Sequence, residues 1–182
     1  MSTTRNGILN LLDQTKDISL LDVVRSEHFQ PAIRNLVPEL IDFLFSKKVI
    51  RQIFSILLTK KSFKEIIFEE NPSSISISLE NQEGEPSEQQ IRLIEDIFAK
   101  LITTNIGTIQ SSLCTNDAVC DYINEFISHS TVSTDCKISG LFTKILRQLI
   151  YSTEGNYIQK IPNLFQFLLQ RINILSYSIL LK

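Results

Sequence analysis

The chain has 182 residues and a mass of 20.8 kDa, which is the size of a single domain. Apolar residues make up 43% and charged residues 21%, as in ordinary globular proteins, which argues against a disordered chain and against an integral membrane protein. Only 5 Gly and 5 Pro supply turns, too few for a fold with many strands. We therefore expect one helical domain over residues 1–182.

Net charge and its distribution limit the kinds of partner. With 18 Lys and Arg against 20 Asp and Glu, the chain has a net charge of −2 and no general attraction to nucleic acid or anionic lipid. The charge is segregated, because residues 65–96 hold nine acidic side chains and one basic side chain. Such segregation favours a protein partner over a polyanion, although the acidic block could also be a solvated loop.

The cysteines and the apolar runs indicate the compartment. Cys114, Cys120 and Cys136 are odd in number and irregularly spaced, which argues against a disulfide framework and favours a reducing compartment. The first ten residues contain no apolar signal core, and the chain contains no run of eighteen apolar residues. We expect a cytoplasmic protein that could also enter the nucleus, with no membrane partner.

Apolar residues recur at helical spacing along most of the chain. Ser19 and Ser26 are expected to cap the second and third helices of the first third of the chain. Pro38 lies inside the third helix and should kink or break it. The helices expected in this part of the chain lie at residues 8–12, 20–25, 27–44, 47–58 and 63–67.

Residues 71–86 differ in composition from the rest of the chain. They are rich in Ser, Glu, Asn, Pro and Gly, which break regular structure. The alternation SISISL at 74–79 is typical of a strand, but it has no second strand to pair with. We expect an acidic loop or a disordered insertion here.

The second half of the chain again predicts helices. Ser87 and Gln90 form a capping box, Asn116 is expected to cap a later helix, and Pro162 suits a first turn. The predicted helix that begins at residue 138 should end before Gly155. The helices expected in this half lie at residues 91–102, 106–113, 119–127, 138–150, 164–169 and 174–181.

About nine or ten short helices with short links should pack antiparallel or at right angles to their neighbours. No strict repeat is visible, but loose helix pairs of divergent sequence are typical of HEAT and armadillo solenoids. We therefore expect an all-α, HEAT/armadillo-like α-solenoid fragment. The last predicted helix is apolar and lacks a polar cap, so we expect more protein to follow Lys182.

Several segments occur in an order that resembles a known family. LLD at 11–13 and SLLDVV at 19–24 are followed by LIDFL at 40–44, which is the most specific of these segments. The later segments are KLITTNI at 100–106, YINEFI at 122–127, FTKI at 142–145, LI at 149–150 and FL at 167–168. This order resembles the N-terminal part of the helical domain in the SAPS family, the regulatory subunits of protein phosphatase 6-type enzymes.

The resemblance implies a non-catalytic role. A member of this family would bind a serine/threonine phosphatase catalytic subunit through a helical-repeat surface, by shape and charge complementarity. It would need no cofactor and no small-molecule substrate.

The residues themselves offer little catalytic chemistry. No glycine-rich phosphate loop and no hydrolase or metalloprotease motif occurs in the chain. Cys114, Cys120, His129 and Cys136 are four soft ligands, but they lack the close Cys pair of a zinc knuckle, so ordinary thiols are the simpler interpretation. A thiol–imidazole dyad with His28 or His129 would need the fold to join distant residues. We expect no enzyme activity and no metal.

A basic stretch is the one candidate binding site. It has no acidic residue between Asp42 and Glu65, and it could contact an acidic protein surface or a phosphate backbone. Phe54 belongs to the apolar face and cannot stack on bases, so nucleic acid is the less favoured partner and a solvated helix back is the simplest interpretation. The candidate partner-binding residues are Lys47, Lys48, Arg51, Lys60, Lys61 and Lys64.

Two functions therefore remain as hypotheses. The first is a regulatory scaffold that binds a phosphatase catalytic subunit. The alternative is a small nucleic-acid-binding helical module that uses the basic stretch at 47–64, and its affinity should fall steeply with salt.

Overall fold

The computed structural model describes residues 2–14, 18–59, 88–128 and 135–181. Every regular element within these ranges is a helix, and no strand occurs in them, which confirms the all-α fold class. The expected acidic loop at 71–86, the predicted helix at 63–67 and the proposed cap at Ser87 lie outside the described residues.

Within each described range, the helices follow one another through short links. In chain order they are α1 (Ser2–Gln14), α2 (Leu20–Arg25), α3 (Phe29–Arg34), α4 (Pro38–Leu44), α5 (Lys47–Leu58), α8 (Glu88–Ile102), α9 (Gly107–Thr115), α10 (Asp117–Ser128), α11 (Cys136–Ser152), the 3₁₀ helix η1 (Asn156–Lys160), α12 (Leu164–Gln170), α13 (Leu175–Ser178) and the 3₁₀ helix η2 (Ile179–Leu181).

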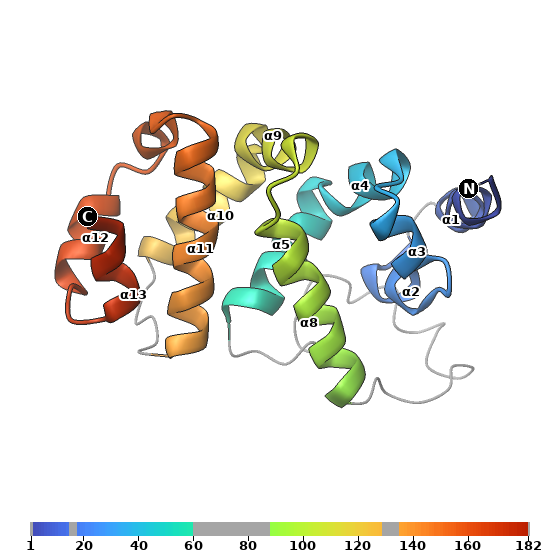
Figure 1. Ribbon diagram of the computed structural model, residues 1–182, viewed down its shortest axis with the longest axis horizontal. Helices are drawn as coiled ribbons and strands as arrows, with labels where there is room; N and C mark the ends of the chain where they lie inside the picture. Colours follow the sequence, from blue (N-terminus) through green and yellow to red (C-terminus); the bar gives the residue numbers. More distant parts are fainter. Residues whose placement is uncertain (1, 15–17, 60–87, 129–134, 182) are drawn as a thin grey trace.

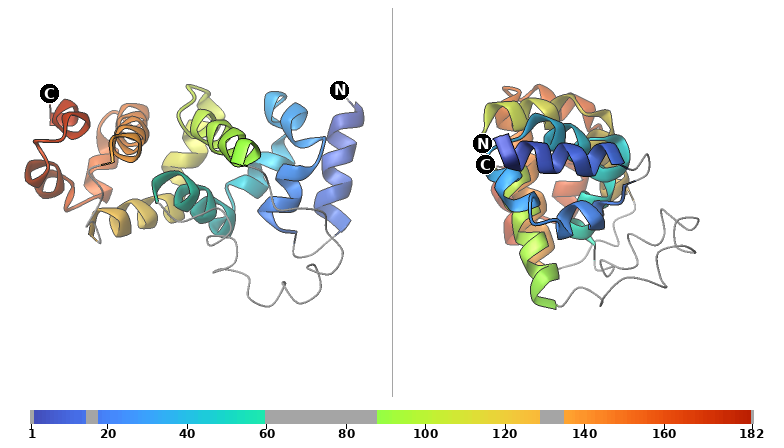
Figure 2. Two further views of the ribbon diagram at one scale, coloured as in Figure 1. Left: turned by 90° about the horizontal axis from the view of Figure 1, so that it is seen from below. Right: turned by 90° about the vertical axis from the view of Figure 1, so that its right-hand side faces the viewer.

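The helices are arranged in a row. Figure 1 shows α1 to α4 at one end, α5 and α8 to α10 in the middle, and α11 to α13 at the other end, with the termini far apart. The same row is visible from below in Figure 2. Neighbouring helices pack on one another along it, including α1 on α3, α5 on α8 and α10, and α11 on α9 and α13.

Aromatic rings join the elements at successive steps of the row. The Phe29 and Phe98 ring centroids lie 6.3 Å apart and join α3 to α8, while Phe54 and Tyr122 lie 5.5 Å apart and join α5 to α10. Phe142 on α11 is fully buried at the next step. Its ring contacts three further rings, Phe126 at 4.6 Å, Phe167 at 5.9 Å and Tyr177 at 6.1 Å. Each such pair adds about 1 kcal/mol to the burial of its apolar area.

The N-terminal helices begin partly where the sequence predicts. Ser19 caps α2 as expected, because its Oγ accepts the Asp22 backbone N–H at 3.2 Å. The prediction for Ser26 was wrong, since this residue ends α2 and α3 begins only at Phe29. Pro38 breaks the predicted long helix as expected, because proline cannot donate within a helix but suits a first position, and it begins α4.

The cap predicted at Asn116 is confirmed. Its Oδ1 accepts the Ala118 backbone N–H at 3.0 Å, which orders the first turn of α10. Its Nδ2 donates to the Phe45 carbonyl oxygen at 2.7 Å, so the α9–α10 turn is also tied to the end of α4. One asparagine therefore fixes a helix start and a contact between elements.

Gly155 and Pro162 lie close to the boundaries of the C-terminal helices. Helix α11 ends before Gly155 as expected, and Gly155 takes a left-handed φ of 88° while its N–H donates to the Ile150 carbonyl oxygen at 2.8 Å. Pro162 precedes α12 by two residues and so lies outside the first turn predicted for it. The helix predicted over 174–181 is divided into α13 and η2.

Candidate functional site

The basic stretch lies only partly within the described residues, at the start of α5. Lys47 and Lys48 are exposed in the first turn of α5, which contains no acidic residue. Positive charge at a helix N-terminus opposes the helix dipole and costs on the order of 0.3–1 kcal/mol per residue. The other lysines of the stretch, Lys60, Lys61 and Lys64, lie outside the described residues.

Arg51 has a structural role within the fold. Its Nη2 lies 2.6 Å from Glu125 Oε2, and its guanidinium lies 5.9 Å from the centre of the Tyr122 ring. These contacts join α5 to α10 beside the Phe54–Tyr122 ring pair. Arg51 is thus directed into a helix–helix contact, which leaves Lys47 and Lys48 as the outward-facing described members of the predicted site.

A groove lies between the end of α5, the middle of α8 and the start of α11. Its volume is about 160 Å³, below the roughly 300 Å³ at which small-molecule pockets begin. Its lining combines apolar side chains with three carboxylates and one ammonium group. The lining residues are Ile56, Leu57, Thr59, Glu95, Asp96, Ala99, Asp135, Lys137, Ile138 and Leu141.

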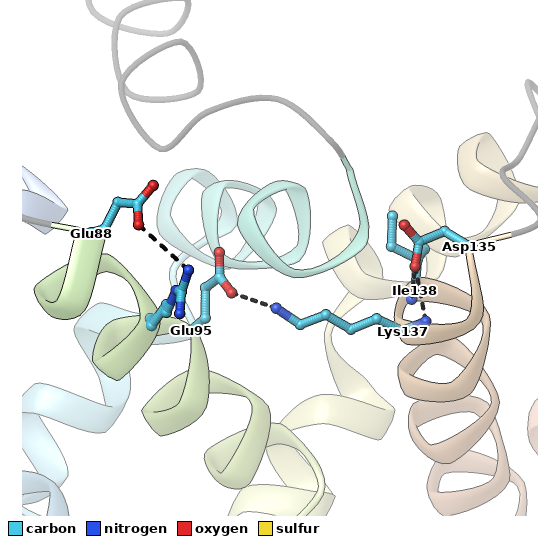
Figure 3. A network of polar contacts seen from close by, with 6 residues as sticks. Glu88, Glu95, Asp135, Lys137 and Ile138 are labelled. Atoms are coloured by element: carbon cyan, nitrogen blue, oxygen red, sulfur yellow. Dashed lines mark hydrogen bonds and ion pairs between the residues drawn. The ribbon is translucent and has the colours of Figure 1, made fainter.

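The rim of this groove is held by polar contacts between α8 and α11. Lys137 reaches from the first turn of α11 to Glu95 on α8, with Nζ 2.7 Å from Oε2 (Figure 3). Asp135 is the N-cap of α11, because its Oδ1 accepts the backbone N–H groups of Lys137 at 2.9 Å and Ile138 at 3.4 Å. These contacts fix the positions of α8 and α11 on two sides of the groove.

Two of the cysteines lie near the 3₁₀ helix η1. Asn124 Nδ2 donates to the Lys160 carbonyl oxygen at 3.1 Å and lies 3.5 Å from the Cys120 sulfur. The Lys160 ammonium donates to the Cys114 carbonyl oxygen at 3.3 Å. Burial raises the pKa of both the Cys114 and Cys120 thiols, and the nearby Lys160 charge only partly opposes this. A raised thiol pKa disfavours the thiolate that a nucleophile or metal ligand requires.

The residues weighed for zinc and for a catalytic dyad are not brought together within the described part of the chain. Cys136 is exposed at the start of α11, and His129 lies outside the described residues. His28 precedes α3, and its Nε2 lies 3.7 Å from Glu27 Oε1. In the four described ranges, no three His, Cys, Asp or Glu side chains gather closely enough to hold a metal ion.

The sequence did not predict an exposed apolar face on α12. Leu164, Phe167 and Leu168 are buried, whereas Phe165 is 56% exposed and Leu169 is 61% exposed. Helical spacing groups Phe165 and Leu169 with Leu164 and Leu168. The available signal was the run LFQFLL, because five apolar residues among six are too many for one buried face of a helix at the end of a row.

Comparison with protein-family models, with curated proteins and with solved structures gives no match. Among the helices of the described residues, none combines the length and apolar character needed to cross a bilayer.

Proposed function

We propose that this protein is a non-catalytic, HEAT/armadillo-like scaffold that binds another protein. The row of helices carries the proposal, since an open stack leaves long surfaces exposed along its length (Figure 2). The groove between α5, α8 and α11 supports it, because it is too small for most metabolites and its lining combines apolar and charged side chains.

The partner that we propose is the catalytic subunit of a protein phosphatase 6-type enzyme. The support is the SAPS-like order of segments, of which LIDFL at 40–44 is the most specific. This segment forms α4, with Leu40 and Leu44 buried and Asp42 exposed, as a packed helix of a repeat would require. The scaffold would hold the catalytic subunit without taking part in a covalent step.

The start of α5 is the proposed contact. Lys47 and Lys48 add two positive charges to the positive end of the helix dipole, and this combination fits an acidic surface on the partner.

Affinity capture from the native extract tests this proposal. The wild-type chain should recover a phosphatase catalytic subunit, and the double variant Lys47→Glu/Lys48→Glu should recover about tenfold less. That variant stays folded, because glutamates suit the first turn of a helix. The matched control is Lys144→Glu/Arg147→Glu, which makes the same charge change at exposed positions of α11.

Two results would count against the proposal in different ways. Wild-type capture without any phosphatase catalytic subunit would overturn the partner. Equal recovery by the two double variants would overturn the contact at the start of α5 while leaving the partner in place.

A further inference from the structure

Asp96 differs from the other charged residues that line the groove between α5, α8 and α11. It is exposed, and it has no hydrogen bond or ion pair with any residue in the part of the chain that the structure describes. Asp96 and Ala99 are three positions apart on α8 and therefore share a side of that helix. A ligand in the groove can reach the Asp96 carboxylate without displacing an existing contact.

The other two carboxylates of the groove are already engaged. Glu95 pairs with Lys137 at 2.7 Å, and Asp135 accepts two backbone N–H groups as the N-cap of α11 (Figure 3). The Glu95–Lys137 pair is neutral as a whole, and the dipole of α11 partly offsets the charge of Asp135. With three carboxylates and one ammonium group, the lining keeps a formal charge of −2. A single cation therefore complements the groove better than an anion or a neutral group does.

The rest of the lining favours a cation with an apolar stem. Ala99 on α8 and Leu141 on α11 line the groove and are partly exposed. Arginine and lysine side chains suit such a lining, because their methylene stems pack on apolar groups while the charged head stays in water. A metal ion does not, since within the described residues no three acidic, histidine or cysteine side chains gather to hold one. The volume of about 160 Å³ is below that of small-molecule pockets and suits one side chain.

We propose that the groove binds the side chain of one arginine of a partner protein. The guanidinium pairs with the Asp96 carboxylate, and the methylene stem lies between Ala99 and Leu141. Arginine is favoured over lysine, because its guanidinium is less strongly hydrated and donates two parallel hydrogen bonds to one carboxylate. The inference rests on the proposed protein-binding role and deepens it, because it names the chemistry that a second surface of the scaffold recognises.

Amide NMR of the isotope-labelled full chain, titrated with N-acetyl-arginine amide, tests the proposal. The backbone amide signals of Asp96, Ala99 and Leu141 should shift together. They should saturate with a Kd of about 1 to 10 mM, which is the strength expected from one solvent-exposed ion pair and a small apolar contact. N-acetyl-citrulline amide has nearly the same shape but no charge, and it should bind about fivefold more weakly.

Two variants separate the carboxylate from the apolar contact. Asp96→Asn removes the charge at an exposed position and should weaken binding about fivefold. Ala99→Leu keeps the carboxylate but occupies the space of the methylene stem, and it should weaken binding to a similar extent. The matched control is Asp121→Asn, which removes an exposed carboxylate of α10 outside the groove and should bind like the wild type. Circular dichroism checks that each variant keeps its helices.

The proposal is overturned if no binding occurs at about 50 mM ligand, if the shifts lie outside the groove, or if either Asp96→Asn or Ala99→Leu binds like the wild type. Equal binding of the citrulline derivative would also overturn it, because the groove would then take a neutral side chain. The titration uses the chain and a small ligand alone, so its failure leaves the capture of a phosphatase subunit untested by it. A successful titration with a failed capture would overturn the phosphatase partner and keep the arginine site.

Discussion

The hydroxyl groups of Tyr157 and Tyr177 are buried, and neither has a hydrogen-bond partner within the described structure. Burying such a group without a partner costs about 1–3 kcal/mol, while the ring itself gains from burial. The ring of Tyr157 also lies 5.7 Å from the Lys160 ammonium. These tyrosines therefore stabilise the fold through their rings and not through their hydroxyl groups.

Tyr157→Phe should consequently increase the free energy of unfolding by about 1 kcal/mol, because it removes the unpaired hydroxyl and keeps the ring. Urea denaturation measures this as a higher midpoint with an unchanged slope. The control is Tyr151→Phe, since Tyr151 is 69% exposed and its hydroxyl is solvated. A loss of stability above about 1 kcal/mol in Tyr157→Phe would mean that the hydroxyl is bonded, and would contradict the interpretation.

The same burial makes stability depend on alkaline pH. Burial raises the pKa of the Tyr157 and Tyr177 hydroxyls, and it also raises the pKa of the Cys114 and Cys120 thiols. Above the unfolded-state values, about 8.5 for cysteine and 10 for tyrosine, the unfolded chain loses protons that the folded chain retains. The free energy of unfolding should therefore keep its full value below about pH 8 and should decrease as the pH rises from about 9 to 11.

Urea titrations at pH 7, 9.5 and 11 check this dependence. The double variant Tyr157→Phe/Tyr177→Phe should lose less stability than the wild type between pH 9.5 and 11, because two of the four groups are gone. Parallel curves for the two proteins over that interval would show that these hydroxyls do not titrate as buried groups.

At the scale of the elements, the N-cap of α11 contributes to the candidate groove. Asp135 accepts two backbone N–H groups at the start of α11, which lines the groove. Asp135→Ala should lower the free energy of unfolding by about 1 kcal/mol, whereas Asp135→Asn should keep most of it, since asparagine caps helices almost as well. Thermal or urea denaturation compares the two variants, and equal losses from both would assign the effect to the charge and not to the cap.

Helices were the most predictable feature of this chain, because periodicity is a local property. The apolar face of α5 was predicted from spacing alone, and Phe54 and Ile53 on it are fully buried. Ser26 was assigned to the wrong helix, because it follows one short helix and precedes another, and either could use it as a boundary residue. The exposure of Phe165 and Leu169 could not be predicted, since spacing does not tell whether a helix has neighbours on one side or on two.

Contacts between residues that are far apart in the chain could not be predicted from the sequence. Arg51 looked like a free member of a basic stretch, and its role depends on Glu125, which is 74 positions away. The groove could not be predicted for the same reason, because Glu95 and Lys137 come into contact only when α8 and α11 pack together. The parts of the candidate site that the sequence did predict, Lys47 and Lys48, are local features of one helix.

At the scale of the molecule, the arrangement of helices in a row gives the protein its proposed role. The two ends differ, because α1 at one end carries Arg5 paired with Glu39, whereas α12 at the other end exposes Phe165 and Leu169. Between them lie the start of α5 and the groove, which are the surfaces proposed for another protein.

The nucleic-acid alternative makes a separate prediction at this scale. If the basic stretch bound a phosphate backbone, affinity for RNA or DNA would fall by orders of magnitude between about 50 and 200 mM salt. With Arg51 engaged by Glu125 and a net charge of −2, we expect no binding of this kind at low salt. Fluorescence anisotropy with a labelled oligonucleotide measures it, and steep salt-dependent binding would favour the alternative.

The most direct test of the proposed scaffold is a binding titration between the purified chain and a purified protein phosphatase 6-type catalytic subunit. The account predicts saturable one-to-one binding with a Kd below about 10 µM, weakened about tenfold by Lys47→Glu/Lys48→Glu and unchanged by Lys144→Glu/Arg147→Glu. No binding at catalytic-subunit concentrations up to about 100 µM would contradict it.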